Sequence, residues 1–398
     1  MKRTIFIFCQ YITPPDIPGG HKRFELACEL VRKGNEVYIF SSNFNHMSKN
    51  NVRQFSERYC IEKVDGVNFV WMNTFEYFHN NWRRAVNMAV YGFKSYRISL
   101  ELAQRGVHPD VIIGTVAHVF SVASAYFVCK TLKSRFFIEI GDLWPEVFAT
   151  SGKMSKTNPV YILLKKLMSY FYNRAEKIIC LTDDTVSYFR NTGYGSKAIL
   201  VPFGIKPKIE VSSETSLKPE HGFKVIYAGS FQPIYPLDKV IEAAKLIECY
   251  GMGNIKFILM GNGVLKENLK ALTKELNVKN VEFLDPLPKR DLVGFLKSAS
   301  ALILIEKKAS YGFPNKLIDY LAAGRPIIYA SDVRHNILNS GCCVEASCAD
   351  PEDIALSVIR IANRSKNELE RMASHAREYL HANHNIEIIT DRFVEHIL

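Results

Sequence analysis

SYGFPNKLIDYLAAGRPIIYA, residues 310–330, carries the clearest local pattern in this chain of 398 residues. A Gly-Phe-Pro turn leads into a run whose apolar residues recur at the spacing of a helix that is covered on one face. Gly324 ends this run, because glycine readily adopts the left-handed conformation that closes a helix. Residues 326–330 then predict a buried strand. Loop, helix, tight turn and strand in this order are typical of an α/β protein.

Three polar residues in this stretch are placed to bind an anionic ligand that carries hydroxyl groups. Asn315 and Lys316 stand at the predicted helix start, where unpaired backbone N–H groups and the helix dipole attract anions such as phosphate. Asp319 follows one turn later on the same side and can accept hydrogen bonds from the hydroxyls of a ribose. The combination suits a sugar nucleotide. The alternative is a surface helix whose Lys and Asp have no special role.

The same stretch resembles the C-terminal donor-binding motif of the family 4 glycosyltransferases, which have the GT-B fold. That family has two glutamates eight positions apart; here Asp319 takes the second place, and Tyr311 departs from the first. Residues 314–320, PNKLIDY, are similar to a Pro-Ser-Lys-Leu-Phe-Glu-Tyr version in one branch of the family. That branch transfers N-acetylated amino sugars for O-antigen and capsule. The resemblance implies a retaining, metal-independent reaction.

Composition narrows the class of protein. The chain has 398 residues, which is longer than a chain that folds around a single hydrophobic core. Two domains are therefore expected. Nine cysteines without a Cys-x-x-Cys pair support neither a zinc site nor a disulfide framework, and they favour a reducing cytoplasm.

Residues 1–205 hold 26 Lys and Arg against 16 Asp and Glu, whereas residues 206–398 hold 25 against 24. A basic first half predicts an anionic membrane surface as partner, since no nucleic-acid recognition module is visible.

Strand-like and helix-like runs alternate along both halves, which predicts parallel sheets wrapped by helices. The uncharged run 111–129 is expected to be a strand followed by a helix, with a membrane span as the alternative. We expect a GT-B fold, with two Rossmann-like domains that face each other across a deep cleft. The expected parts are an acceptor-binding domain (1–205), a polar linker (206–222), a donor-binding domain (223–375) and a C-terminal helix (376–398) that packs back on the first domain.

Loops after the predicted strands supply further donor-site candidates, because ligands of parallel sheets bind beyond the strand carboxyl ends. Gly19-Gly20 stands before a helix, where backbone can approach a phosphate, although a plain turn explains it equally well. Ser230 replaces an Arg of the family, which leaves Lys316 as the main candidate to stabilise the leaving diphosphate. The resemblance implies donor contacts in the second half at Gly229, Ser230, Lys239, Gly261, Asn262 and Leu287.

The first half holds the candidates for the acceptor side of the reaction. His118 follows the strand 111–115 and can donate to a hydroxyl or carbonyl, which makes it a catalytic candidate beside Lys316. A satisfied core histidine is the alternative. In the loop 142–146, DLWPE, Asp142 and Glu146 can bind sugar hydroxyls and Trp144 can stack on a sugar ring. The amino-sugar branch has a very similar loop, and a helix start capped by Asp142 is compatible with this role.

Basic and aromatic residues interleave in two predicted helical stretches, 75–102 and 160–177. Such helices suit the interface of a membrane with anionic lipids, although domain-packing helices with solvated outer faces explain them equally well. Arg83 and Arg84 in the first stretch are candidates to bind an acceptor. We therefore expect a cytoplasmic protein that is attached peripherally to the inner face of the cell membrane.

These features together predict a glycosyltransferase that needs no metal and no cofactor. It would move an N-acetylated hexosamine from a UDP-sugar to a lipid-linked or glycan acceptor in surface polysaccharide synthesis. One alternative is a non-hydrolysing UDP-sugar epimerase on the same fold. The other is a catalytically inactive, membrane-associated binding protein, which the Tyr311 departure favours.

Overall fold

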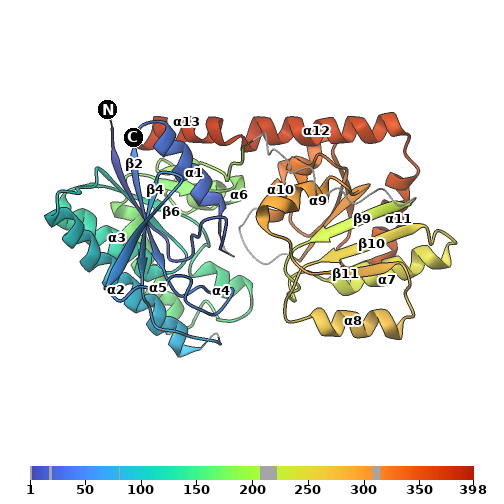
Figure 1. The fold of residues 1–398 in the computed structure, drawn as a ribbon, viewed down its shortest axis with the longest axis horizontal. Coiled ribbons are helices and arrows are strands. Elements are labelled where there is room, and N and C mark those ends of the chain that lie inside the picture. Colours follow the sequence, from blue (N-terminus) through green and yellow to red (C-terminus); the bar gives the residue numbers. More distant parts are fainter. Residues whose placement is uncertain (1, 18–19, 80, 207–221, 308–313) are drawn as a thin grey trace. The chain divides into compact units, whose positions relative to one another are not determined.

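The computed structural model describes residues 2–17, 20–79, 81–206, 222–307 and 314–398, without the side chains of residues 289 and 290. The described residues form two units (Figure 1). Unit 1 contains residues 2–205 and Asn385–Leu398, and unit 2 contains the residues between them.

Unit 1 is built on an eight-stranded sheet with the order β3-β4-β2-β1-β5-β6-β7-β8. Only β3 is antiparallel to its neighbour among these strand pairs. The central strands are almost wholly buried, because helices cover both faces and leave no polar side to the sheet. The strands are β1 (Thr4–Phe8), β2 (Glu36–Ser42), β3 (Tyr59–Val64), β4 (Val67–Met72), β5 (Val111–Thr115), β6 (Arg135–Glu139), β7 (Ile178–Cys180) and β8 (Ala198–Leu200).

Two hydrophobic cores lie on the two faces of this sheet. One core is shared with α1 (Lys22–Arg32) and α13 (Ile386–Ile397), whereas α2 (Trp82–Gln104), α3 (Val119–Leu132) and α5 (Pro159–Arg174) cover the other face (Figure 1). The short helices are α4 (Glu146–Thr150) and α6 (Asp183–Asn191).

Unit 2 has a six-stranded parallel sheet with the order β11-β10-β9-β12-β13-β14. Its strands are β9 (Phe223–Ala228), β10 (Ile255–Met260), β11 (Val281–Leu284), β12 (Ala301–Glu306), β13 (Ile327–Ser331) and β14 (Cys343–Ala346). Its helices are α7 (Leu237–Cys249), α8 (Lys266–Glu275), α9 (Lys289–Leu296), α10 (Asn315–Ala323), the 3-10 turn η2 (Asn336–Ser340), α11 (Pro351–Ala362) and α12 (Lys366–His384).

The predicted α/β class with two Rossmann-like domains is confirmed. The run 111–129 forms β5 and most of α3, and none of the helices in the described ranges is both long and apolar enough to cross a membrane. The C-terminal segment that belongs to unit 1 begins at Asn385, after α12 has ended in unit 2. The sequence patterns did not predict the β3–β4 hairpin or β8.

Candidate functional site

Lys316 is the centre of a small cage at the start of α10 in unit 2. Its Nζ donates a hydrogen bond of 2.9 Å to the hydroxyl of Tyr227. The same ammonium lies 4.5 Å from the ring centroid of Tyr227 and 3.4 Å from that of Tyr235. Aromatic faces attract a cation without using its N–H groups as hydrogen-bond donors. Within the described residues, the Tyr227 hydroxyl is the hydrogen-bond acceptor of Lys316, so donor capacity remains for a ligand.

Burial controls the charge of this lysine. Desolvation lowers the pKa of Lys316 to about 7, and the charge of Glu306 at the end of β12 counteracts that shift. Burial also raises the pKa of Glu306, while Lys316 opposes the increase. A bound anion would stabilise the protonated form of Lys316 and raise its pKa again. The site therefore favours an anionic ligand.

Two glycines, Gly229 and Gly261, shape the backbone beside Lys316. A Cβ at Gly229 would lie 3.0 Å from Lys316 Nζ and 2.9 Å from the Tyr227 hydroxyl, so a larger residue would displace the cage. A Cβ at Gly261 would lie 1.8 Å from the carbonyl oxygen of Gly229, and Gly261 also has a φ of +155°. The loops after β9 and β10 therefore pack against each other next to α10.

The other predicted donor residues in unit 2 fall on neighbouring loops. Ser230 accepts a 2.9 Å hydrogen bond from the Tyr227 hydroxyl through its carbonyl oxygen. The carbonyl of Asn262 accepts from Phe231 N–H at 2.9 Å. Leu287 follows β11 and is half-buried. These contacts bring Gly229, Ser230, Gly261 and Lys316 together, while the donor roles themselves stay predictions.

Three further candidates are placed differently. Asn315 is exposed at the first residue of α10, whereas Asp319 is buried one turn later. Lys239 makes its polar contacts with its own helix, since its Nζ lies 2.8 Å from Glu242 Oε2 and 3.8 Å from Asp238 Oδ2. The structure therefore does not join Lys239 to the Lys316 cage. Gly19 and Tyr311 lie outside the described residues.

His118 in unit 1 is fully buried before α3. Its Nδ1 accepts the backbone N–H of Ser121 at 3.2 Å, which makes His118 the N-cap of α3. Its Nε2 lies 2.6 Å from Gln10 Oε1 and therefore carries the proton. Burial, helped by the charge of Arg84, lowers the pKa of His118 to about 3. The imidazole is neutral and both its nitrogens are occupied, which matches the satisfied core histidine; its catalytic role stays a prediction.

A polar cluster surrounds Arg84 where the strands of unit 1 end. Burial and the charges of Arg84 and Lys49 together lower the pKa of His46 to about 4. Desolvation raises the pKa of Asp142, and the charge of Arg84 opposes that increase. His46 Nδ1 lies 2.7 Å from the Tyr77 hydroxyl. The Tyr11 hydroxyl is buried beside Arg84 and Tyr77. Basic and hydroxyl groups at this sheet edge can bind an anionic or hydroxylated substrate.

The loop 142–146 divides into an exposed and a buried part. Asp142 is exposed, whereas the ring of Trp144 is half-buried against Phe148, with centroids 4.6 Å apart. Glu146 is buried, and its Oε1 accepts from the Tyr188 hydroxyl at 2.6 Å. That same oxygen also lies 3.4 Å from the Tyr161 hydroxyl and 3.4 Å from Lys165 Nζ. Glu146 therefore ties α4 to α5 and α6, which leaves Asp142 as the more accessible acceptor candidate.

Two predicted residues remain. Arg83 is exposed, and its guanidinium lies 5.9 Å from the ring of Phe75 and 5.7 Å from that of Trp82. Gly20 is exposed and forms a bridge with Ile12. In the part of the chain that the structure describes, no three His, Cys, Asp or Glu side chains gather in a way that could hold a metal ion.

The sequence patterns did not indicate the cage residues Tyr227, Tyr235 and Glu306 or the cluster residues Tyr11, His46 and Tyr77. Glu306 could have been predicted as a site residue. It is the one charged residue of the apolar strand ALILIE, and it stands at the carboxyl end, where ligands of parallel sheets bind. Tyr227 could not have been predicted from its position, because aromatic residues inside apolar strands usually pack in the hydrophobic core.

The second half of the chain matches a known family. Residues 208–379 fit the family model described as Glycosyl transferases group 1. The chain is also 20% identical over 253 residues to the probable glycosyltransferase WbjE of Pseudomonas aeruginosa. That alignment spans 59% of this chain and 61% of the relative.

Solved structures are similar over the full chain. Sucrose-phosphate synthase of Thermosynechococcus elongatus has a TM-score of 0.75 at 14% identity, covering 99% of this chain and 98% of that one. HepE of Anabaena in complex with UDP and glucose has a TM-score of 0.68 at 13% identity, covering 99% of both chains. At these identities the likeness defines the fold, which is that of GT-B proteins. The match to the group 1 glycosyl transferase model lies within residues 208–379, most of which belong to unit 2.

Proposed function

We propose that this chain transfers a sugar from a UDP-sugar to a lipid-linked or glycan acceptor, with retention at the anomeric carbon. Unit 2 binds the donor, and Lys316 stabilises the leaving diphosphate. The observation that carries this proposal is the Lys316 cage at the start of α10, inside the residues that match the group 1 family. A preorganised cation at the position where negative charge develops is a major source of catalysis.

The comparisons support a uridine nucleotide. HepE of Anabaena is described in complex with UDP and with UDP-glucose, and the trehalose-6-phosphate protein of E. coli with UDP-2-fluoro glucose. The latter has a TM-score of 0.71 at 12% identity. The α10 helix start and its lysine can hold a diphosphate in the same way for any nucleotide, so the base is inferred from these relatives.

For the sugar we propose an N-acetylated hexosamine, possessing or lacking the 6-hydroxyl. The support is the similarity of residues 314–320 and 142–146 to the amino-sugar branch of the family. A Tyr at position 311, in place of the glutamate, offers an apolar ring face and one hydroxyl. Such a residue tolerates a donor that carries an N-acetyl group or lacks a hydroxyl.

The acceptor side belongs to unit 1, and we propose that it works at an anionic membrane surface, in the synthesis of a surface polysaccharide such as O-antigen or capsule. Large apolar side chains are exposed on the helical face formed by α2, α3 and α5, among them Phe93 at 65% and Leu163 at 65%. Lys165 and Lys166 are exposed beside them on α5. Exposed apolar side chains interspersed with lysines favour an interface with anionic lipids.

A donor panel tests the proposal. Purified protein is incubated with UDP-N-acetylhexosamines, their 6-deoxy forms, UDP-glucose and a GDP-sugar, each with lipid extract, and the products are separated by mass. Transfer of an N-acetylated hexosamine to a lipid is expected. Epimerised UDP-sugar without transfer would favour the epimerase, and binding alone would favour the inactive protein. A preference for UDP-glucose or for a GDP-sugar would contradict the proposed sugar.

A further inference from the structure

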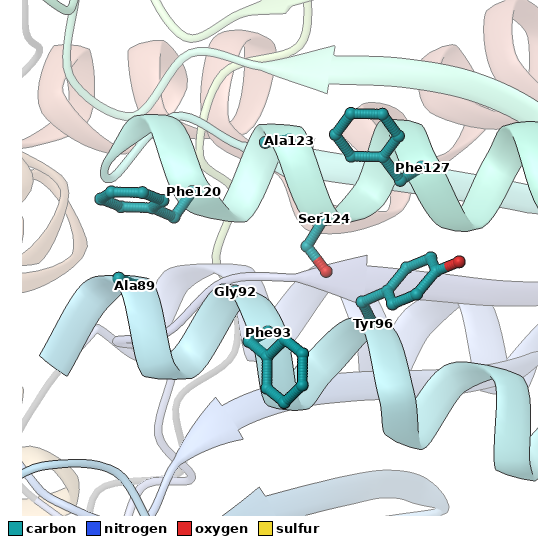
Figure 2. A pocket seen from close by; sticks show the side chains of 8 residues that line it. All are labelled: Ala89, Gly92, Phe93, Tyr96, Phe120, Ala123, Ser124 and Phe127. Carbon is teal, nitrogen blue, oxygen red and sulfur yellow. The ribbon is translucent and has the colours of Figure 1, made fainter. Parts of the chain in front are cut away.

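Two features among the described residues lie outside the Lys316 cage. The first is an apolar groove between α2 and α3, lined by Phe93 and Tyr96 from one helix and by Phe120 and Phe127 from the other (Figure 2). Its lining includes no charged side chain and no thiol. The second is a pair of adjacent cysteines in unit 2, and this pair carries chemistry that the proposed function does not use.

Cys342 and Cys343 stand between η2 and the body of β14, which is the edge strand of the unit 2 sheet. Gly341 turns the chain just before them, with a φ of +82°. The two Sγ atoms lie 3.6 Å apart, and both thiols are in the reduced form. Cys342 is fully buried, whereas Cys343 is partly exposed. Two thiols at this distance titrate together and can react with each other.

Hydrogen bonds stabilise a thiolate at Cys342. The thiol of Cys343 donates to it, and the Ser340 hydroxyl lies 3.0 Å from its Sγ and can also donate. The bond from Cys343 has the largest influence, and together with Ser340 it lowers the pKa of Cys342 against the opposing effect of burial. The same contact, with burial, raises the pKa of Cys343. The pair therefore loses its first proton from Cys342, and a thiolate is the form of cysteine that reacts with oxidants.

Cys348, a third cysteine of this region, has a different environment. Its thiol donates to Asp332 Oδ1 at 3.3 Å. Burial, followed by this hydrogen bond, raises the pKa of Cys348 to about 11. Cys348 stays a thiol at neutral pH, so in this region the reactive form is expected at the adjacent pair.

We propose that Cys342 and Cys343 form a reversible redox pair, which a hydroperoxide such as hydrogen peroxide closes to a disulfide. The Cys342 thiolate attacks one peroxide oxygen, so that an S–O bond forms, the O–O bond breaks, and the leaving hydroxide takes a proton from solvent. The Cys343 sulfur then attacks the sulfenic sulfur of Cys342. The S–S bond forms, the S–O bond breaks, and hydroxide leaves as water with the proton of Cys343. Two thiols and one peroxide give one disulfide and two waters.

The disulfide between adjacent residues is expected to be reduced easily. Adjacent Cα atoms are about 3.8 Å apart across a trans peptide, whereas disulfides usually join Cα atoms about 4.4–6.8 Å apart. Ring closure must therefore distort the peptide between the two cysteines, and strained disulfides are the labile ones. A reversible response to an oxidant is thus favoured over a permanent cross-link.

The peptide that would be distorted belongs to the contact between β14 and β13. The carbonyl of Cys342 accepts the N–H of Ile327 at 3.0 Å, and Cys343 stands opposite Ile327 in the register of the two strands. Ile327 begins β13, shortly after Gly324 has closed α10. Closing the disulfide should therefore loosen the start of β14 from β13.

The test treats the full chain with hydrogen peroxide for increasing times, blocks the remaining thiols with iodoacetamide in denaturant, and identifies the products by mass. Cleavage after Glu345 separates the pair from Cys348, and the exposed Cys249 reports unspecific oxidation. We expect a peptide that has lost two hydrogen atoms and takes no label. It should form about tenfold faster than Cys249 is oxidised, because thiolate character controls the reaction. Dithiothreitol should restore both thiols.

Two variants separate the steps of the reaction. In Cys343→Ser the sulfenic acid has no thiol to attack it, so a dimedone adduct should accumulate at Cys342, whereas wild type should show little adduct. Ser340→Ala removes a hydrogen bond to the Cys342 sulfur and should slow disulfide formation by about threefold or more. Ser347→Ala, at an exposed serine of the same segment, is the matched control and should leave the rate unchanged.

Hydrogen exchange of the reduced and the oxidised chain measures the loosening. Amides at the start of β13 and in β14 should exchange faster after oxidation, whereas those of α8 should not change. A disulfide that forms without any change of exchange in β13 and β14 would overturn the proposed loosening.

Three results would overturn the redox pair itself. The first is oxidation of Cys342 or Cys343 to a sulfinic acid without a disulfide. The second is a disulfide that joins Cys348 to either of them. The third is an oxidation rate of the pair no higher than that of Cys249. Each of these results is read from the wild-type chain, so the decision does not depend on the folding of a variant.

Discussion

The two candidate catalytic residues are the half-buried Lys316 in unit 2 and the fully buried His118 in unit 1, and their surroundings differ. Lys316 rests on two tyrosine rings, and its hydrogen-bond acceptor among the described residues is the Tyr227 hydroxyl. His118 has both ring nitrogens engaged, one by the N–H of Ser121 and the other by Gln10.

This difference separates a residue that is ready for a ligand from one that supports the fold. A lysine with spare donors in a desolvated cage gains free energy when an anion arrives. A histidine with satisfied nitrogens would have to break existing hydrogen bonds before it could contact a substrate. We therefore infer that the larger catalytic contribution comes from Lys316.

The largest expected effect is that of Lys316→Met on turnover. The substitution keeps an apolar stem in the tyrosine cage and removes the charge opposite the leaving group. Transfer should fall by about 100-fold or more, the loss typical for a preorganised stabilising group. The measurement is the initial rate of sugar transfer at saturating donor. Lys239→Met is the matched control and should change the rate little, because that lysine is held by Glu242. A folded Lys316→Met protein of normal turnover would remove Lys316 from the site.

The next effect is a pH dependence of UDP binding. The pKa of Lys316 is lowered to about 7 in the free protein, so its protonated fraction falls as the pH rises above 7. A bound diphosphate raises that pKa, hence binding takes up a proton, and affinity falls by up to about tenfold per pH unit above 7. Calorimetry at pH 7–9 in buffers of different ionisation enthalpy measures both quantities. Affinity that is flat over this range in the wild type, or equally steep in Lys316→Met, would contradict the assignment.

A smaller effect is expected from His118→Ala, and it should appear in stability. Loss of the α3 cap and of the Gln10 hydrogen bond should lower the free energy of unfolding by about 1–3 kcal/mol. His118→Asn should recover part of this loss, because Asn is a good N-cap. Denaturant unfolding of the three proteins checks the order. If His118→Ala lowered turnover without changing stability, His118 would be a catalytic residue instead.

The smallest expected effect is that of a chelator. Since the proposed diphosphate site uses Lys316 and the start of α10, EDTA should leave sugar transfer unchanged. The measurement is the transfer rate after dialysis against EDTA and again after addition of Mg²⁺ or Mn²⁺. Abolished activity that only a divalent ion restores would show that the diphosphate is stabilised in another way.

Sequence patterns predicted the architecture because it depends on local signals. Apolar strands of three to seven residues and one-sided helices alternate, and Gly324 closes α10 with a φ of +61° as its position after the helical run implies. The β3–β4 hairpin escaped prediction. Its turn, Asp65-Gly66, is a known hairpin signal, but β3 alternates between half-buried and exposed residues and therefore lacks a clear apolar face.

The site could be predicted only in part, because its cage is formed by side chains from distant strands. Lys316 was visible from its place at a helix start. Tyr227 and Glu306 reach it from β9 and β12, and nothing local in those strands indicates a shared neighbour. His118 illustrates the opposite case: its position suggested chemistry, whereas its partner Gln10, 108 residues away in the chain, gives it a structural use.

The most direct test of the central claim is a crystal structure of the full chain with UDP. We predict that oxygens of the diphosphate lie within about 3 Å of Lys316 Nζ and of the first backbone N–H groups of α10. The tyrosine cage should keep its place, with the ammonium turned from the Tyr227 hydroxyl toward the phosphate. A diphosphate bound away from α10, with Lys316 still hydrogen-bonded to Tyr227, would contradict the account.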